Sequence, residues 1–176
     1  MKYGLTPLEG LMMGTRTGDI DPAVVFHLQR VAGMSVDEVD TLFNKKSGMK
    51  GLTGESDMRS VWDMIHNDDD PEAQQRARTA MDVYINRLLK YVGSYTAELG
   101  GLDVITFTAG IGENDAAVRR ELAEALAPFG VKIDVEANKV RSGEPRIISA
   151  PDSTVTIYVF PTNEELAIAR QALTFA

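Results

Sequence analysis

The stretch that decides the fold class is Asp103-Val-Ile-Thr-Phe-Thr-Ala-Gly-Ile-Gly-Glu-Asn114. Its first half is a β-branched and aromatic run, which is typical of a buried strand in a parallel sheet. Its second half carries two glycines and predicts a tight turn, and residues Asp115 to Pro128 place apolar side chains at helical spacing. Strand, glycine turn and helix in this order predict an α/β protein.

The residues that follow extend this pattern. Two further strands are predicted at Arg146–Ser149 and Thr154–Phe160, and together with the first they would form a mixed sheet flanked by helices. A final helix is expected after Asn163. Its apolar positions, expected to face inward, are Leu166, Ala169 and Leu173.

The residues that precede the pattern read mainly as helices. The longest helix is predicted from about Pro71 to Leu99, as a core helix, a dimerisation helix or both. Its expected apolar stripe consists of Met81, Tyr84, Leu88, Tyr91, Val92, Tyr95 and Leu99. Ser35 and Glu38 predict a capping box at the start of a shorter helix. Residues 47–56 carry three glycines and predict a loop.

Composition narrows the class of protein. The 176 residues are 44% hydrophobic and 25% charged, which is ordinary for a soluble globular protein and fits one domain over residues 1–176. A net charge of −8 argues against nucleic acid or an anionic membrane as the main partner. Cysteine is absent, which excludes disulfides and thiol nucleophiles. No secretory signal or membrane span is recognisable, so a cytoplasmic location is expected.

Two motifs each follow a predicted strand and begin a predicted helix. The glycines of Gly110–Asp115 could bring the backbone close to a phosphate or nucleotide, although the run matches neither the Walker A loop nor the dinucleotide fingerprint. The alternative is a plain strand-to-helix turn. Glu164 could hold Mg²⁺ through oxygen. The alternative is an acidic residue that complements the helix dipole.

Two arginines are candidates for phosphate or nucleotide contacts. Arg16 lies between glycines and could stabilise charge on a phosphoryl group in transfer. It could instead be a surface residue paired with Asp19 or Asp21. Asp57 could accept from ribose hydroxyls and Arg59 could contact a base or phosphate. The alternative is a helix-capping Asp57 and a solvated Arg59.

The combination of motifs resembles one family. Its blocks occur in order at Thr6–Pro22, Ser47–Gly51, Ser56–Arg59, Phe107–Asn114 and Pro161–Leu166. Together they resemble the C-terminal half of the acetate kinases, from Gly4 to about Leu173. The resemblance implies the RNase H-like fold of the acetate and sugar kinase, Hsp70 and actin superfamily, with helical insertions. It also implies Mg²⁺-dependent (or Mn²⁺-dependent) transfer of phosphate from ATP to acetate, giving ADP and acetyl phosphate.

The resemblance implies roles for individual residues. Arg16 matches the arginine that stabilises the transferring phosphoryl group, and Glu164 matches the Mg²⁺-associated glutamate. Contacts with ATP are implied for Asp57, Met58, Arg59, Gly110, Ile111, Gly112, Glu113 and Asn114. A homodimer through this half of the protein is also implied.

The departures from the family limit these expectations. The family's first domain, with further catalytic residues, has no counterpart here, and Met1-Lys-Tyr-Gly4 stands where the family usually has Thr-Ser-Met-Gly. We therefore expect the isolated chain to bind nucleotide but to be nearly inactive. Two alternatives stay open: a propionate or other short-chain acyl kinase, and a non-catalytic nucleotide-binding and dimerisation module.

Overall fold

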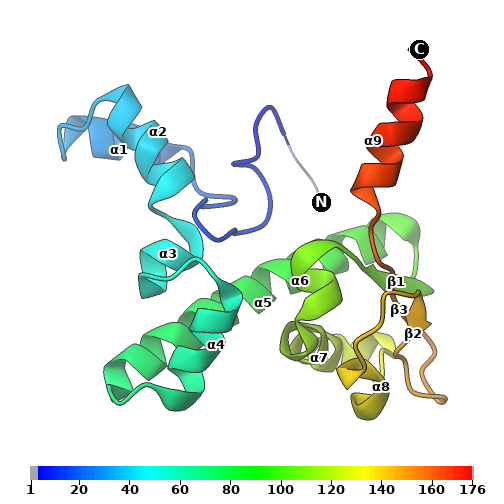
Figure 1. Ribbon diagram of the computed structural model, residues 1–176. Helices are drawn as coiled ribbons and strands as arrows, with labels where there is room; N and C mark the ends of the chain where they lie inside the picture. Colours follow the sequence, from blue (N-terminus) through cyan, green and yellow to red (C-terminus); the bar gives the residue numbers. More distant parts are fainter. Residues whose placement is uncertain (1–3, 176) are drawn as a thin grey trace. The chain divides into compact units, whose positions relative to one another are not determined.

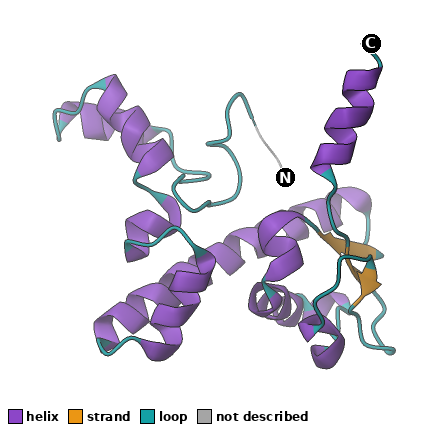
Figure 2. Cartoon of the chain, in the orientation of Figure 1, coloured by secondary structure: helices purple, strands orange, loops and turns teal. Residues whose placement is uncertain are grey.

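Residues 4–175 are described in this computed structural model, so the unusual start at residues 1–3 lies outside the described part. The chain divides into two compact units, one ending at Lys90 and the other beginning at Tyr91 (Figure 1). Figure 2 shows that helices dominate and that the strands gather in one place. The single domain expected over the whole chain stays a prediction.

The first unit is helical. Residues 4–22 form no regular helix or strand, and the helices after them are α1 (Ala23–Arg30), α2 (Val36–Lys45), α3 (Gly48–Thr53), α4 (Met58–Asn67) and the first part of α5 (Pro71–Leu99). The predicted capping box is confirmed at α2. The Ser35 hydroxyl accepts from the Glu38 amide, and the Glu38 carboxylate accepts from the Ser35 amide at 2.8 Å.

The loop predicted at 47–56 is wrong, because Gly48–Thr53 forms helix α3. Its first amides find acceptors on a distant loop: Met49 donates to Met13 at 3.0 Å, and Lys50 donates to Gly14 at 2.9 Å. These bonds satisfy amides that have no partner inside the helix. Gly48 has φ +64°, so glycine serves here to start the helix against another backbone.

Helix α5 has the predicted bounds, but its buried face differs from the predicted stripe. Met81 and Tyr84 are buried as expected, whereas Tyr95 and Leu99 are 41% and 78% exposed. The remaining buried residues of the helix are Ala73, Ala77, Ala80 and Ile85. The predicted stripe consists of large apolar side chains and leaves out the alanines, which are small but allow close packing. The predicted buried face therefore lies too close to the C-terminal end of the helix.

The second unit contains the predicted mixed sheet. Its strands are β1 (Val104–Phe107), β2 (Arg146–Ile147) and β3 (Thr156–Val159), in the order β1-β3-β2. β1 pairs with β3 in parallel, and β2 pairs with β3 antiparallel. The helices of this unit, besides the end of α5, are α6 (Ala109–Asn114), α7 (Ala116–Ala125), η1 (Ala127–Phe129), α8 (Val135–Lys139) and α9 (Glu164–Leu173).

The core of the second unit is made by residues of α7 and of the sheet. Val118 and Leu122 of α7, Leu126 directly after it, and Ile157 and Val159 of β3 are all buried. The sequence did not predict α8. No membrane-spanning helix occurs in the described residues, since none combines the required length with the required apolarity.

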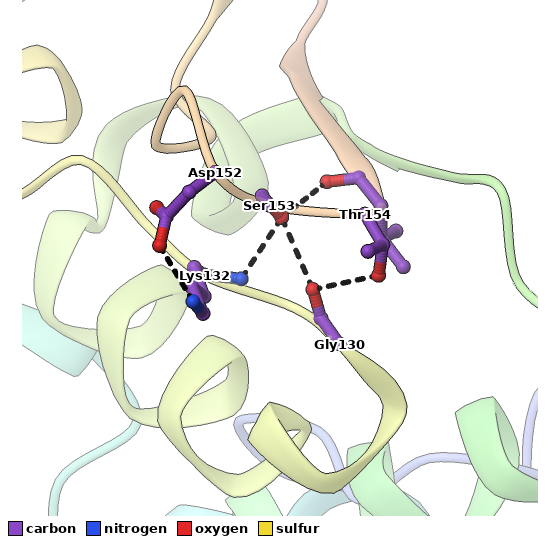
Figure 3. Close-up of polar contacts among 6 residues, drawn as sticks. Gly130, Lys132, Asp152, Ser153 and Thr154 are labelled. Atoms are coloured by element: carbon purple, nitrogen blue, oxygen red, sulfur yellow. Dashed lines mark hydrogen bonds and ion pairs between the residues drawn. The ribbon is translucent and has the colours of Figure 1, made fainter.

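A polar cluster fixes the chain before β3 to the turn after α7 (Figure 3). The Thr154 amide and hydroxyl both donate to the Gly130 carbonyl, at 3.2 and 3.1 Å. The Ser153 hydroxyl accepts from the Lys132 amide at 3.0 Å, and the Lys132 ammonium pairs with Asp152 at 2.6 Å. These contacts set where β3 begins relative to α7.

Helix α9 begins where expected, because the Asn163 side chain accepts from the Leu166 amide at 2.9 Å. The expectation that Leu166, Ala169 and Leu173 face inward is wrong. All three are exposed, and no described residue of α9 is buried. Helical spacing predicts an apolar face, but it does not show that another element covers that face.

Gly48 and Gly33 provide a matched test of the contact between α3 and the 13–16 loop. Both have φ near +65°, but a Cβ on Gly33 would meet nothing within 4 Å. A Cβ on Gly48 would overlap the Met13 carbonyl and lie 2.6 Å from the Arg16 carbonyl oxygen. We expect Gly33→Ala to lower the free energy of unfolding by about 1 kcal/mol, and Gly48→Ala by a further ~2 kcal/mol or more. Urea denaturation followed by circular dichroism measures both, and equal losses would contradict this account.

Candidate functional site

The backbone around Arg16 is tightly held. The Met13 amide donates to the Arg16 carbonyl at 3.1 Å, and the Thr17 amide donates to Phe43 at 3.1 Å. The Thr15 hydroxyl donates to Asn44 at 2.9 Å. Together with the bonds to α3, these contacts fix the loop at both ends.

The Arg16 guanidinium, in contrast, is little used. Its Nε is buried without a hydrogen-bond partner among the described residues, and Nη1 lies 3.8 Å from the Met13 sulfur, a weak acceptor. Asp19 and Asp21, the alternative ion-pair partners, accept instead from the amides of Gly10 and Ala23. A fixed backbone with spare donors is what an anion-binding arginine requires.

The segment Asp57–Arg59 lies in the same unit, next to the Arg16 loop. A Cβ on Gly14 would lie 2.9 Å from the Ser56 carbonyl oxygen, so the loop passes close to the residue before Asp57. Asp57 caps α4 by accepting from the Arg59 amide at 2.9 Å.

Asp57 and Arg59 also bind each other. Hydrogen bonds from the Arg59 guanidinium and amide lower the pKa of Asp57 to about 2. The Arg59 side chain is 91% exposed, whereas Met58 is buried, with 8% of its surface exposed. This is the helix-capping arrangement considered as the alternative, and the nucleotide contacts of the three residues stay predictions.

The second group of predicted residues follows β1. Gly110–Asn114 belongs to the short helix α6 rather than to the expected tight turn, and the helix begins at Ala109 with φ +59°. That φ lies in the left-handed region, which costs an alanine about 1 kcal/mol or more. Gly112 lies against Phe107, where a Cβ would be 3.3 Å from backbone, so the helix packs closely on the strand end.

Glu113 ties α6 to the chain that follows β3. Its carboxylate accepts from the Thr162 amide at 2.8 Å and from the Thr162 hydroxyl at 2.9 Å. The Thr162 amide is the main reason that the pKa of Glu113 lies below its usual value; the hydroxyl, the Ala109 amide and the Arg146 charge act in the same direction. Thr162 lies inside the Pro161–Leu166 block. The sequence did not predict its contact with Glu113, because the two residues are 49 positions apart.

These contacts border a hollow of about 520 Å³, a size common for ligand sites. Because β1 and β3 run parallel, their carboxyl ends meet at one edge of the sheet. The hollow lies there, and the described residues that line it all follow one of the two strands: Ala109, Gly110, Glu113, Thr162, Asn163, Glu164 and Glu165. Ile111, Gly112 and Asn114 are not in the lining, and the Asn114 side-chain Nδ2 donates to the Gly110 carbonyl.

The structure therefore brings the predicted residues together in two groups, one in each unit. Arg16 and Asp57–Arg59 belong to the first, and Gly110–Glu113 and Glu164 belong to the second. Both the glycine motif and the Glu164 motif reach the same hollow.

The fit of a divalent cation can be judged from the carboxylates. No group of three or more His, Cys, Asp or Glu side chains placed to hold a metal occurs in the described residues. Mg²⁺ at nucleotide sites is usually held by one or two carboxylates, with phosphates and water completing its shell. Glu164, exposed in the wall of the hollow, fits that mode as a single protein ligand.

Comparison with known proteins agrees with this architecture. The model of the acetokinase family matches residues 1–170. An acetate kinase of Corynebacterium efficiens is 54% identical over 173 residues, which are 98% of this chain and 42% of that protein. The chain thus spans about two fifths of the length of the curated relatives that it matches.

Solved structures give the same result. A Porphyromonas gingivalis acetate kinase superposes with a TM-score of 0.87 at 42% identity, over 97% of this chain and 42% of that one. A propionate kinase from Francisella tularensis superposes with a TM-score of 0.84 at 40% identity, over 94% of this chain and 41% of that one. The predicted actin- and Hsp70-like fold is confirmed, and this chain belongs to the acetokinase family.

Proposed function

We propose that the complete protein is an acetate kinase and that this chain supplies the nucleotide side of its active site. An acetate oxygen would attack the γ-phosphorus of ATP, the bond from that phosphorus to the β–γ bridging oxygen would break, and ADP and acetyl phosphate would leave. The observation that carries the proposal is the hollow at the shared carboxyl edge of β1 and β3, the usual place for ligands in such sheets.

The roles of the lining residues follow from their positions. Gly110 has open space where a side chain would be, so its backbone can approach the nucleotide. Glu164 would hold Mg²⁺ or Mn²⁺, which when bound supplies positive charge to the phosphates. Glu113 is assigned a different role, because its Oε1 already accepts two hydrogen bonds from Thr162 and joins α6 to the chain after β3.

Arg16 would act on the transferring phosphoryl group. Its buried Nε lacks a partner among the described residues, and its loop is fixed by backbone hydrogen bonds. A donor positioned before the reaction stabilises developing charge without reorganising. Asp57, Met58 and Arg59 complete the proposed nucleotide contacts.

A propionate kinase is the second candidate, favoured by the similarity to the Francisella protein. We propose acetate first because the curated relatives named above are acetate kinases. Turnover of acetate and propionate by the complete protein separates the two. We also propose a cytoplasmic homodimer, which fractionation and light scattering test.

The isolated chain should bind nucleotide without turning it over, because in-line transfer needs charge neutralisation on both sides of the phosphoryl group. Calorimetry with ADP and Mg²⁺ should show saturable binding, and hydroxylamine trapping should detect no acetyl phosphate. Robust turnover would contradict the proposal that this chain supplies only one side of the active site. Failure to bind any nucleotide would overturn the proposed site itself.

Arg16→Ala, made in a complete protein, should lower kcat about 10²–10³-fold with little change in nucleotide Kd, as loss of a transition-state donor does. Arg30→Ala is the control, because Arg30 lies over the Phe26 ring on α1 and outside both groups of site residues. Steady-state kinetics and calorimetry measure the two quantities. Equal losses in kcat and affinity would contradict the role.

Glu113 should make stability depend on pH. Its pKa is lowered in the folded protein, so its contribution is complete above the unfolded pKa, about 4.3, and is lost as pH falls through the lower folded pKa. Glu113→Gln should therefore lower Tm by about 1–4 °C at pH 7, a small effect for an accessible carboxylate. The difference from wild type should shrink below about pH 4. Glu144→Gln, on the surface, is the control, and a difference that stays constant with pH would refute this account.

A further inference from the structure

Arg119 of α7 is the most unusual side chain of the second unit. It is 2% exposed, and it is the largest of the fully buried side chains among the described residues. Arginines are rarely buried to this extent, because removing a charge from water is costly unless hydrogen bonds compensate. Nothing in the sequence marked it, since it occupies an ordinary helical position.

All of its guanidinium nitrogens are used. Nη1 donates to the carbonyls of Gly112 and Glu113, both at 2.9 Å. Nε donates to the Asn138 side-chain oxygen and Nη2 to the Asn138 carbonyl, both at 2.7 Å. Asn138 is itself 3% exposed, and its side-chain Nδ2 donates to the Ala116 carbonyl at 2.8 Å. One side of the guanidinium is thus fixed to α8, and the other holds α6.

The acceptors on α6 lie in its last turn. Carbonyls at the end of a helix lack partners within the helix, so Arg119 satisfies groups that α6 cannot satisfy by itself. A six-residue helix is too short to be stable alone, and this one starts from Ala109 at an unfavourable φ. External contacts must therefore hold α6 in place.

Glu113 is the residue at which two such contacts meet. Arg119 binds its carbonyl, and Thr162 binds its carboxylate. Glu113 also lines the hollow. The buried guanidinium is thus 2.9 Å from the backbone of a residue in the wall of the proposed nucleotide site.

We propose that Arg119, anchored by Asn138, is a positioning residue that fixes the last turn of α6 and thereby the Ala109–Glu113 wall of the nucleotide site. The inference rests on the proposed function, because it takes the ligand of the hollow to be a nucleotide. Arg119 need not touch the ligand. It acts through the two carbonyls that it binds.

The test uses the whole chain and a neighbouring arginine as its control. Arg119→Met keeps most of the side-chain volume but removes the donors, and Arg119→Lys keeps the charge with fewer donors. Arg120→Met, one position along α7, removes an accessible arginine that pairs only loosely with Glu124, at 3.8 Å. Hydrogen exchange of amides 113–115 and the Kd for ADP with Mg²⁺ are measured for all variants.

We expect Arg119→Met to speed exchange at amides 113–115 at least tenfold, while exchange at Thr156 and Phe160 in the sheet region changes less than twofold. ADP affinity of the folded variant should fall about tenfold. Arg119→Lys should recover part of both, and Arg120→Met should match wild type. A purely structural arginine would lower Tm and leave exchange at 113–115 and the Kd unchanged, which would overturn the proposal.

Two further outcomes distinguish a failure of the proposed role of Arg119 from a failure of the proposed nucleotide site. If Arg119→Met does not fold, the same criteria apply to Arg119→Lys: wild-type exchange at 113–115 and wild-type Kd in that variant would overturn the proposal. If the wild-type chain does not bind ADP, the proposed nucleotide site fails. The exchange comparison then still shows whether Arg119 fixes α6.

Discussion

The parallel pairing of β1 with β3 is the constraint on which the candidate site of the second unit depends. It brings the carboxyl ends of two strands, separated by about fifty residues of chain, to the same edge of the sheet. The chain leaving β1 becomes α6, and the chain leaving β3 becomes the start of α9. The Glu113–Thr162 contact then joins the two exits and closes one side of the hollow.

Arg16 and Arg119 show that partners, rather than residue type, decide what an arginine does. Arg16 lies on a loop whose backbone bonds are satisfied by α3 and α2, while its Nε has no partner among the described residues and its Nη1 has only the Met13 sulfur. Arg119 uses every guanidinium nitrogen, and four of its five N–H donors bind carbonyl and amide oxygens of α6 and α8. The first arrangement suits an anion that comes and goes, and the second suits a permanent scaffold.

Local patterns predicted the parts of the fold that depend on local physics. The strand at β1, the capping box of α2 and the length of α5 each follow from neighbouring residues. The predicted burial of β1 is wrong, because only Phe107 is buried and Val104 is 51% exposed. Helix α3 did not, because its glycine-rich sequence is helical only where carbonyls more than thirty positions earlier accept its first amides. Thr162 and Arg119 were missed for the same reason, since both act through contacts distant in sequence.

The charge of the hollow bears on how a nucleotide could bind there. Its charged lining residues, Glu113, Glu164 and Glu165, are all acidic, and no lysine or arginine lies in its described lining. Nucleotide phosphates are also anionic, so like charges would repel each other at close range. Thr162 offsets only one carboxylate. A nucleotide in this hollow would therefore need a divalent cation between its phosphates and the remaining carboxylates, which is the arrangement proposed for Glu164.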